Sequence, residues 1–270
     1  MQQKCIFYKD AQISYADYGS NHADTIVLLH GFLESSLIWD DFSKQLSKEY
    51  RIVTIDLLGH GNSDCIGYIH SMELMAQCVY QVIEHLNISN FLLLGHSMGG
   101  YVALAFAEKY PKYLMGLVLF HSSAMADSRQ KKESRLKAIE AAKKNKPLYV
   151  TATIPNLFKK ENSERFKLEF EKIKVIANNT SIQGIVAALE GMRKRIPRKK
   201  VLRKINKPVL FIIGKYDTAV PLNKVVSQLT LASHTEAIIL DKVGHMGFIE
   251  ASTETLLGIQ AFASKVFSLS

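Results

Sequence analysis

The fold of this 270-residue chain is best predicted from one stretch, Phe91-Leu92-Leu93-Leu94-Gly95-His96-Ser97-Met98-Gly99-Gly100. It opens with an apolar run, which is typical of a strand buried on both faces. The residues after it, up to Ala107, are rich in helix formers. The pattern G-x-S-x-G between them predicts a sharp strand-to-helix turn that exposes the hydroxyl of Ser97. The helix that follows would direct its positive N-terminal end at that hydroxyl, which favours a developing anion.

Working outward from this turn, apolar strands alternate with helical patterns. Strands are predicted at residues 4–18 as a hairpin, then at 25–30, 51–56, 91–94, 115–120, 209–213 and 236–240. Helices are predicted at 36–48, 72–86, after Ser97, at 223–232 and within 253–267. Such alternation predicts an α/β fold with a mostly parallel central sheet and helices on both of its faces.

The alternation stops for about 80 residues in the second half of the chain. Residues 124–203 are charged, helical in pattern and without a strong strand signal. We therefore assign residues 1–121 and 206–270 to the core, and residues 122–205 to an inserted helical lid. Ligands bind at the carboxyl ends of the strands in such sheets, so a lid inserted there is expected to cover the site.

The lid segment also holds the charge excess. The chain has 34 basic and 25 acidic residues, and 22 basic but only 8 acidic residues fall within 122–205. This asymmetry is compatible with an anionic substrate, but we favour a lysine-rich solvated surface, because charge runs often only solvate a face. The basic runs at 193–195 and 198–200 lack interleaved aromatic residues, so no nucleic-acid partner is predicted.

Composition sets the remaining expectations. The N-terminal residues 1–5 are polar, unlike a signal peptide, and no apolar run approaches the ~20 residues of a membrane span. Cys5, Cys65 and Cys78 are scattered, which favours reduced thiols in the cytoplasm. We expect no metal, no cofactor, and a small-molecule substrate as the partner. The sequence does not indicate an oligomeric state.

A serine hydroxyl is a poor nucleophile, so Ser97 needs a base and an acid that orients the base. His245 lies between two glycines in a loop after the last strand, where it could accept the proton. Asp217 follows a buried strand and could orient the imidazole of His245. Asp241 is closer to His245 in sequence, but it ends a strand and is the weaker candidate. His96 adjoins the nucleophile and should point away from its hydroxyl.

The oxyanion of an acyl-transfer intermediate needs preorganised donors. The N–H of Met98, directly after the nucleophile, is one candidate. The N–H of Phe32, in the turn after the strand at 25–30, is the other. The substrate pocket is predicted to include Leu33, Ser122, Val220 and Met246.

With these motifs in place, the chain resembles the α/β-hydrolase superfamily over nearly its whole length, and within it a small serine esterase-like branch with a helical lid. The order Ser, Asp, His matches that superfamily. The resemblance implies Ser97 as nucleophile, Asp217 as orienting acid and His245 as base. Relatives that open epoxides or remove halide place Asp at the nucleophile position, which Ser97 argues against. The segments that carry the resemblance are His30-Gly31-Phe32, Asp56–Ser63, Gly95–Gly100, Asp217 and Gly244-His245.

Three functions remain open on the sequence alone. The leading hypothesis is hydrolysis of a small carboxylic ester or thioester through an acyl-enzyme. The second is carbon–carbon bond hydrolysis or a lyase reaction on an anionic substrate, with the same triad and with lid arginines as carboxylate partners. The third is a ligand receptor that keeps the fold. The candidate arginines are Arg129, Arg135, Arg193 and Arg195.

Overall fold

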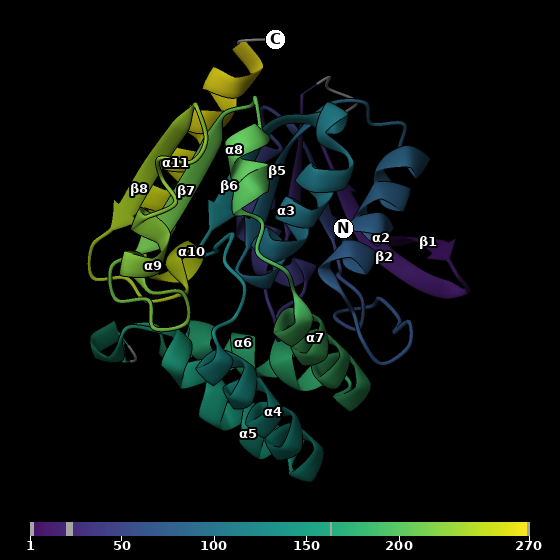
Figure 1. Cartoon of the computed structure of the whole chain (residues 1–270), viewed down its shortest axis with the longest axis vertical. Helices are drawn as coiled ribbons and strands as arrows, with labels where there is room; N and C mark the ends of the chain where they lie inside the picture. The colour runs from purple at the N-terminus through teal and green to yellow at the C-terminus, as the bar shows by residue number, and fades with distance from the viewer. Residues whose placement is uncertain (1–2, 20–23, 163, 269–270) are drawn as a thin grey trace.

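The computed structural model describes residues 3–19, 24–162 and 164–268 (Figure 1). We expected no signal peptide because residues 1–5 are polar. Residues 1–2 of that stretch lie outside the described residues. The centre of the molecule is an eight-stranded sheet in the order β1-β2-β4-β3-β5-β6-β7-β8. Its strands are β1 (Lys4–Tyr8), β2 (Ala11–Tyr18), β3 (Thr25–Leu29), β4 (Arg51–Ile55), β5 (Phe91–His96), β6 (Leu114–Phe120), β7 (Val209–Gly214) and β8 (Thr235–Leu240).

Pairing within this sheet is mostly parallel. Only β2 runs antiparallel to its neighbours, β1 and β4, and the pairs from β4 to β8 are parallel. Every residue of β3, β5 and β7 is buried, as their continuous apolar runs predict. The mostly parallel α/β sheet expected from the sequence is therefore confirmed, and the carboxyl ends of six parallel strands lie at one edge.

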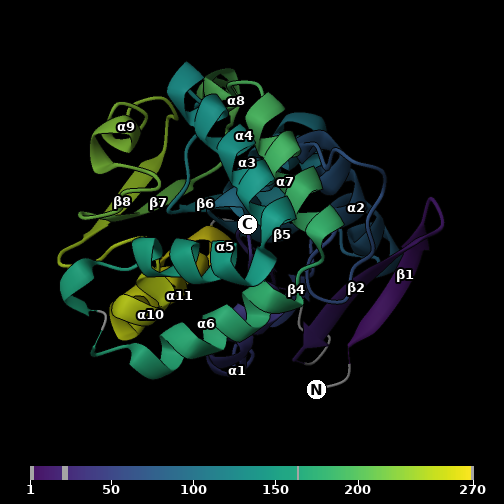
Figure 2. The same ribbon diagram turned by 90° about the horizontal axis from the view of Figure 1, so that it is seen from below.

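Helices cover both faces of the sheet (Figure 2). The helices α2, α3 and α8 lie on one face, while α1, α10 and α11 lie on the other. Helix α2 begins where the side chain of Ser71 accepts the N–H of Leu74, and it buries its apolar stripe against the sheet. Their bounds are α1 (Asp40–Leu46), α2 (Met72–His85), α3 (Met98–Lys109), α8 (Lys199–Lys204), α10 (Gly247–Glu250) and α11 (Ser252–Ser268).

The helix predicted at 223–232 is shorter than expected. Helix α9 spans Leu222–Val226, and the chain then continues in turns. The buried side chain of Gln228 lies just beyond it and bonds to the backbone of Ala124 and Lys224. These hydrogen bonds hold the turns against the loop after β6. The helix therefore ends earlier than its sequence pattern predicts, because tertiary contacts override local helix propensity.

Between β6 and β7 the chain is helical, and no strand occurs within the described residues of that segment. Its helices are α4 (Arg129–Lys144), α5 (Lys146–Thr153), α6 (Lys167–Asn179), α7 (Ile182–Lys194) and α8, with short 3₁₀ turns at Ile154–Leu157 and Lys160–Asn162. Figure 1 shows α4 to α7 as a separate layer at the end of the sheet where the parallel strands finish. Helix α8 lies beside α3 instead.

The guanidinium group of Arg198, just before α8, joins the inserted helices to the core. It bonds to Glu108 of α3 at 3.0 Å and also to Glu73 of α2. Its own side chain is buried, whereas both carboxylates are about half exposed.

As for membranes, none of the helices in the described ranges is both long and apolar enough to cross a bilayer.

Gly99 sets the distance between α3 and the sheet. A Cβ atom built on Gly99 would lie 2.6 Å from the carbonyl oxygens of both Leu29 and His30, and these backbone atoms cannot move aside. We therefore expect Gly99→Ala to lower stability by about 1–3 kcal/mol or more, measured by urea or thermal unfolding.

The matched control is Gly258→Ala in α11. There the nearest atom to a new Cβ is the terminal methyl of Ile238, which can rotate away. This change should leave stability within about 1 kcal/mol of the wild type, because Ala also favours the helix. Equal unfolding midpoints for the two variants would show that the close approach at Gly99 is unimportant.

Candidate active site

Ser97 occupies the turn between β5 and α3 in a strained backbone conformation. Its φ is 50° and its ψ is −112°, outside the regions that L-residues prefer, which costs on the order of 1–3 kcal/mol. Two hydrogen bonds fix this backbone: the Ser97 N–H donates to Phe120 O at 2.8 Å, and Ser122 Oγ donates to Ser97 O at 2.8 Å. The hydroxyl of Ser97 is thereby presented at the carboxyl edge of the sheet.

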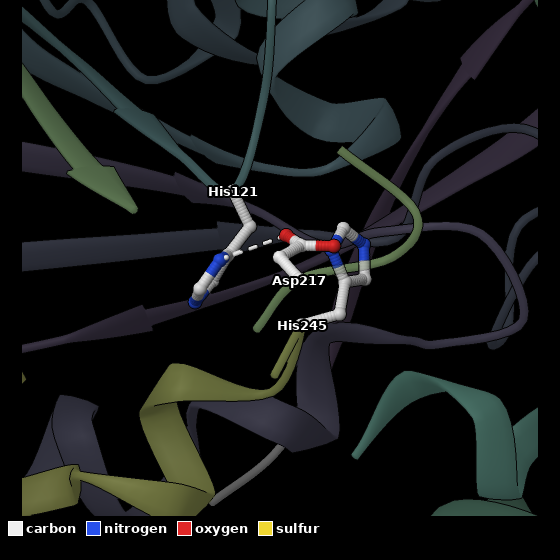
Figure 3. A group of neighbouring side chains, drawn as sticks. All are labelled: His121, Asp217 and His245. Carbon is white, nitrogen blue, oxygen red and sulfur yellow. Dashed lines mark hydrogen bonds and ion pairs between the residues drawn. The ribbon is translucent and has the colours of Figure 1, made fainter. Parts of the chain in front are cut away.

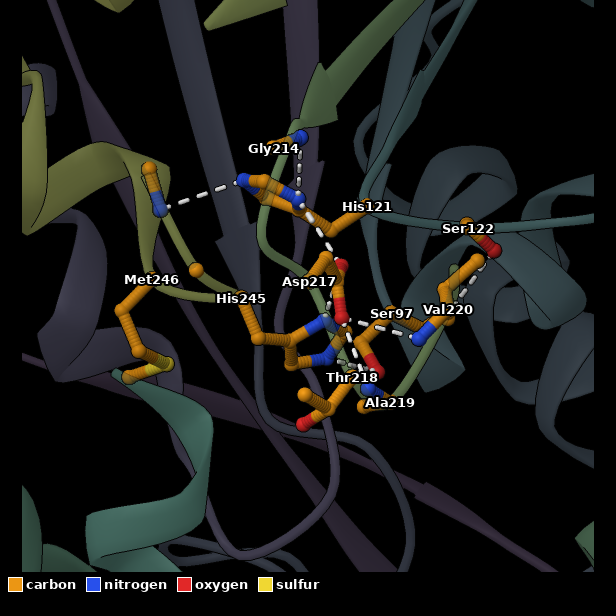
Figure 4. A network of polar contacts seen from close by, with 12 residues as sticks. Ser97, His121, Ser122, Gly214, Asp217, Thr218, Ala219, Val220, His245 and Met246 are labelled. Atoms are coloured by element: carbon orange, nitrogen blue, oxygen red, sulfur yellow. Dashed lines mark hydrogen bonds and ion pairs between the residues drawn. The ribbon is translucent and has the colours of Figure 1, made fainter. Parts of the chain in front are cut away.

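Three side chains from three strand ends form one hydrogen-bonded line (Figure 4). His245 Nε2 lies 2.8 Å from Ser97 Oγ, and His245 Nδ1 lies 2.7 Å from Asp217 Oδ2. With the proton on Nδ1, the ring donates to Asp217 and accepts the hydroxyl proton of Ser97. Asp241, the weaker candidate, is exposed and paired with Lys215 at 3.2 Å. The structure thus brings Ser97, His245 and Asp217 together.

The carboxylate of Asp217 is fully engaged. Its Oδ1 accepts the N–H groups of Ala219 and Val220, both at 2.8 Å. Its Oδ2 accepts from His245 and also from His121 Nδ1 at 3.1 Å. Burial alone would raise the pKa of Asp217, but the charge of His245 and the hydrogen bonds from both imidazoles hold it well below its ordinary value. Asp217 therefore stays ionised beside the base.

His121 is a site residue that the sequence reasoning missed (Figure 3). Its Nε2 faces the N–H of Gly247 at 3.2 Å, so we place the ring proton on Nδ1, which lies 3.1 Å from Asp217 Oδ2 and 3.2 Å from the backbone nitrogen of Gly214. Burial lowers the pKa of His121 to about 4, which keeps the ring neutral at physiological pH. His121 directly follows β6, and Asp217 follows the neighbouring strand β7. This shared position at the sheet edge could have indicated that the two residues lie close together.

Among the described residues, His121, Asp217 and His245 are also the group that could hold a metal ion. The ligand atoms of His121, Asp217 and His245 lie within 4.8 Å of one another. Both Nδ1 atoms donate to Asp217, however, and His121 Nε2 accepts a backbone N–H. The hydrogen bonds account for the cluster, and we interpret it as part of the line that ends at Ser97.

A buried ion pair lies directly behind this line. His96 Nδ1 is 2.9 Å from Glu34 Oε2, and His96 Nε2 donates to the carbonyl of His245 at 3.0 Å. His96 is therefore turned away from the hydroxyl of Ser97. Burial opposes charge on both side chains, yet their mutual attraction prevails: the pKa of His96 is raised and that of Glu34 is lowered.

Glu34, which the sequence reasoning also missed, shapes the turn after β3. Its carboxylate accepts the N–H of Gly31 at 2.5 Å. This bond orients the following peptide, which carries the N–H of Phe32. Within the described ranges, no hydrogen bond engages the amide N–H of Phe32 or of Met98. Both groups are thus available as donors beside Ser97.

A cavity of about 280 Å³ opens at this line, between the sheet edge and the inserted helices. Of the four residues expected in the pocket, Leu33 and Val220 line this cavity, whereas Ser122 and Met246 are not among its lining residues. Ser122 is turned toward the carbonyl of Ser97, and Met246 is buried beneath the loop. The lining residues include Phe32, Leu33, Ser97, Tyr101, Lys131, Arg135, Tyr149, Leu157, Leu189, Met192, Val220 and His245.

Of the four arginines proposed as carboxylate partners, only Arg135 lines the cavity. Arg129 and Arg193 each bond to a glutamate on their own helix. Arg195 bonds to Asp127 at 2.6 Å, and its guanidinium lies 3.9 Å from the ring centre of Tyr101. These three arginines lie outside the cavity lining, and their charges are paired within the segment between β6 and β7.

Comparison with known proteins identifies the family. A family model described as alpha/beta hydrolase fold matches residues 24–252, so the chain belongs to this family. A monoacylglycerol lipase of Bos taurus is 25% identical over 286 residues, spanning 99% of this chain and 84% of the lipase. A 2-hydroxy-6-oxononadienedioate/2-hydroxy-6-oxononatrienedioate hydrolase of Escherichia coli is 28% identical over 251 residues, or 88% and 85% of the two chains.

Solved structures agree with this assignment. A thermophilic esterase from Thermogutta terrifontis superimposes with a TM-score of 0.92 at 27% identity, covering 98% of this chain and 99% of the esterase. An enol-lactonase from Burkholderia xenovorans shares the fold, with a TM-score of 0.90 at 20% identity over 97% of this chain and 100% of the lactonase. The resemblance seen in the sequence is confirmed at the level of the superfamily.

Glu34→Gln tests the buried ion pair. Removing one partner of such a pair costs about 3–5 kcal/mol, because the other charge is left buried and unpaired. The stability that His96 contributes is present below its unfolded pKa of 6.5 and is lost as pH rises through its raised folded value. The share from Glu34 is present above its unfolded pKa of 4.5 and is lost in acid, below its lowered folded value.

Urea unfolding of the wild type and Glu34→Gln at several pH values measures this difference. We expect the largest gap in unfolding free energy between about pH 4.5 and 6.5, and a smaller gap at alkaline pH. A gap that is absent, or that grows with alkaline pH, would exclude a charged Glu34–His96 pair.

Proposed function

We propose that this protein is a serine hydrolase that cleaves small carboxylic esters or thioesters through an acyl-enzyme intermediate. The observation that carries the proposal is the hydrogen-bonded line from Ser97 Oγ through His245 to Asp217. An imidazole nitrogen 2.8 Å from the hydroxyl is within the range that general-base activation requires. The comparisons support ester chemistry through the esterase and the lipase, but they also include a carbon–carbon bond hydrolase.

In the proposed mechanism, Ser97 Oγ attacks the carbonyl carbon while His245 Nε2 takes the hydroxyl proton. Asp217 holds the ring and stabilises the imidazolium. The oxyanion is bound by the N–H of Met98, at the N-terminal end of α3, and by the N–H of Phe32, in the turn after β3. Collapse of the intermediate breaks the bond to the leaving alcohol or thiol, which takes the proton from His245. Water then repeats these steps on the acyl-enzyme and releases the acid.

We further propose that residues 122–205 form a cap over this site. Helices α4, α5 and α7 supply Ala138, Tyr149, Thr153, Leu189 and Met192 to the wall of the cavity. Because the cavity holds only about 280 Å³, it favours a short substrate over a long acyl chain. A cytoplasmic location remains an expectation from composition.

The second candidate is carbon–carbon bond hydrolysis or a lyase reaction on an anionic substrate, with Ser97 and His245 serving proton transfer. It is favoured by the Escherichia coli relative and by two cationic side chains in the cavity, Lys131 and Arg135. A panel of neutral esters and dienoate-type acids separates the reactions. Preferential turnover of dienoates would replace ester hydrolysis as the main activity.

Ser97→Ala is expected to reduce turnover of p-nitrophenyl butyrate by about 10⁴-fold or more, because it removes the group that forms the acyl-enzyme. The matched control, Ser227→Ala, changes an exposed serine after α9 and should retain wild-type turnover. A fluorophosphonate probe should label the wild type and Ser227→Ala, but not Ser97→Ala.

Persistent turnover by Ser97→Ala would end the proposal. Labelling of Ser97 without multiple turnover of any ester or dienoate would instead favour the third hypothesis, a ligand receptor that retains the fold.

A further inference from the structure

Helix α4 contributes two cationic side chains to the cavity wall, Lys131 and Arg135. They are four residues apart and therefore lie on the same face of the helix, one turn from each other. Ala138, at the next position on that face, also lines the cavity. The face of α4 that lines the cavity together with Ser97 and His245 thus carries two cationic side chains.

The two cations differ in their partners. Arg135 Nε donates to one oxygen of Asp127 at 2.5 Å, and Arg195 donates to the other at 2.6 Å. Asp127 is therefore shared by two guanidinium groups. For the ammonium group of Lys131, the structure gives no ion pair or side-chain hydrogen bond within residues 3–19, 24–162 and 164–268.

The other carboxylates of the site are already committed. Asp217 accepts four hydrogen bonds, and Glu34 is bound to His96 and Gly31. Burial and the charge of Arg135, followed in effect by Arg195, lower the pKa of Lys131 despite the opposing pull of Asp127 and Asp217. The Lys131 side of the cavity therefore has more positive than negative charge.

We infer that the cavity takes a substrate with a carboxylate group, which Lys131 binds at the α4 wall while the ester carbonyl lies at Ser97. This inference rests on the proposed function and narrows its substrate class to short esters that also carry a free carboxylate, such as half-esters of dicarboxylic acids. The apolar lining from Tyr149, Leu157 and Leu189 suits the hydrocarbon between the two groups.

The experiment uses monomethyl esters of linear dicarboxylic acids, from succinate to suberate. Each is paired with the same ester in which a carboxamide replaces the free carboxylate. For the best chain length, we expect kcat/KM to be about tenfold or more higher with the carboxylate, since charge-assisted hydrogen bonds are the strong ones. The ratio should fall as salt rises, because Lys131 is exposed to solvent.

Lys131→Met should bring the carboxylate-to-carboxamide ratio close to one, and Lys131→Arg should restore most of it. The matched control is Lys132→Met, on the same helix but outside the cavity lining, which should keep the wild-type ratio and its salt dependence. A wild-type ratio near one at every chain length would overturn the inference, as would an unchanged ratio in Lys131→Met.

Binding separates this result from a failure of the proposed function. If no ester is turned over, calorimetry with the free dicarboxylates and their diamides tests Lys131 directly. Dicarboxylate binding that is lost in Lys131→Met and kept in Lys132→Met would support the anion site even without esterase activity. Equal binding of diacid and diamide, or no binding of either, would reject it.

Discussion

The close approach of backbone to backbone at the β5–α3 turn is the constraint on which the site depends. Gly99 lies against the carbonyl groups that end β3, so α3 starts directly at the sheet edge and Ser97 is forced to a positive φ. This position puts the Ser97 hydroxyl within reach of His245, from the loop after β8. It also places the N-terminal end of α3 beside the turn that carries Phe32. A looser turn would separate these groups.

Charge is then distributed around the turn so that buried charged groups have partners. Asp217 receives four donors, and Glu34 is matched by His96 and a backbone N–H. Since unpaired buried charges are costly, these contacts both stabilise the loops and fix the orientation of His245. Lys131, which is exposed in the cavity lining, has no such partner in the described residues, and we infer that it binds the carboxylate of the substrate.

The sequence predicted the sheet and the convergence of Ser97, Asp217 and His245, because each follows an apolar strand and parallel strands finish at one edge. It missed His121 and Glu34, whose partners lie 96 and 62 residues away in the chain. Ser122 and Met246 lie outside the cavity lining, because proximity to the site in the sequence does not tell which way a side chain turns. The carboxylates that pair with Arg129, Arg193 and Arg195 likewise depend on how the inserted helices pack. Hydrophobic periodicity does not predict these pairs.

In the proposed reaction, Ser97 acts as the nucleophile while the Phe32 and Met98 amides bind the oxyanion. A crystal structure of the protein after reaction with a small alkyl fluorophosphonate tests this most directly, since the tetrahedral phosphorus mimics the intermediate. We predict a covalent bond from Ser97 Oγ to phosphorus, with the phosphoryl oxygen about 2.7–3.1 Å from both amide nitrogens. An adduct on another residue, or a phosphoryl oxygen directed away from both amides, would contradict the account.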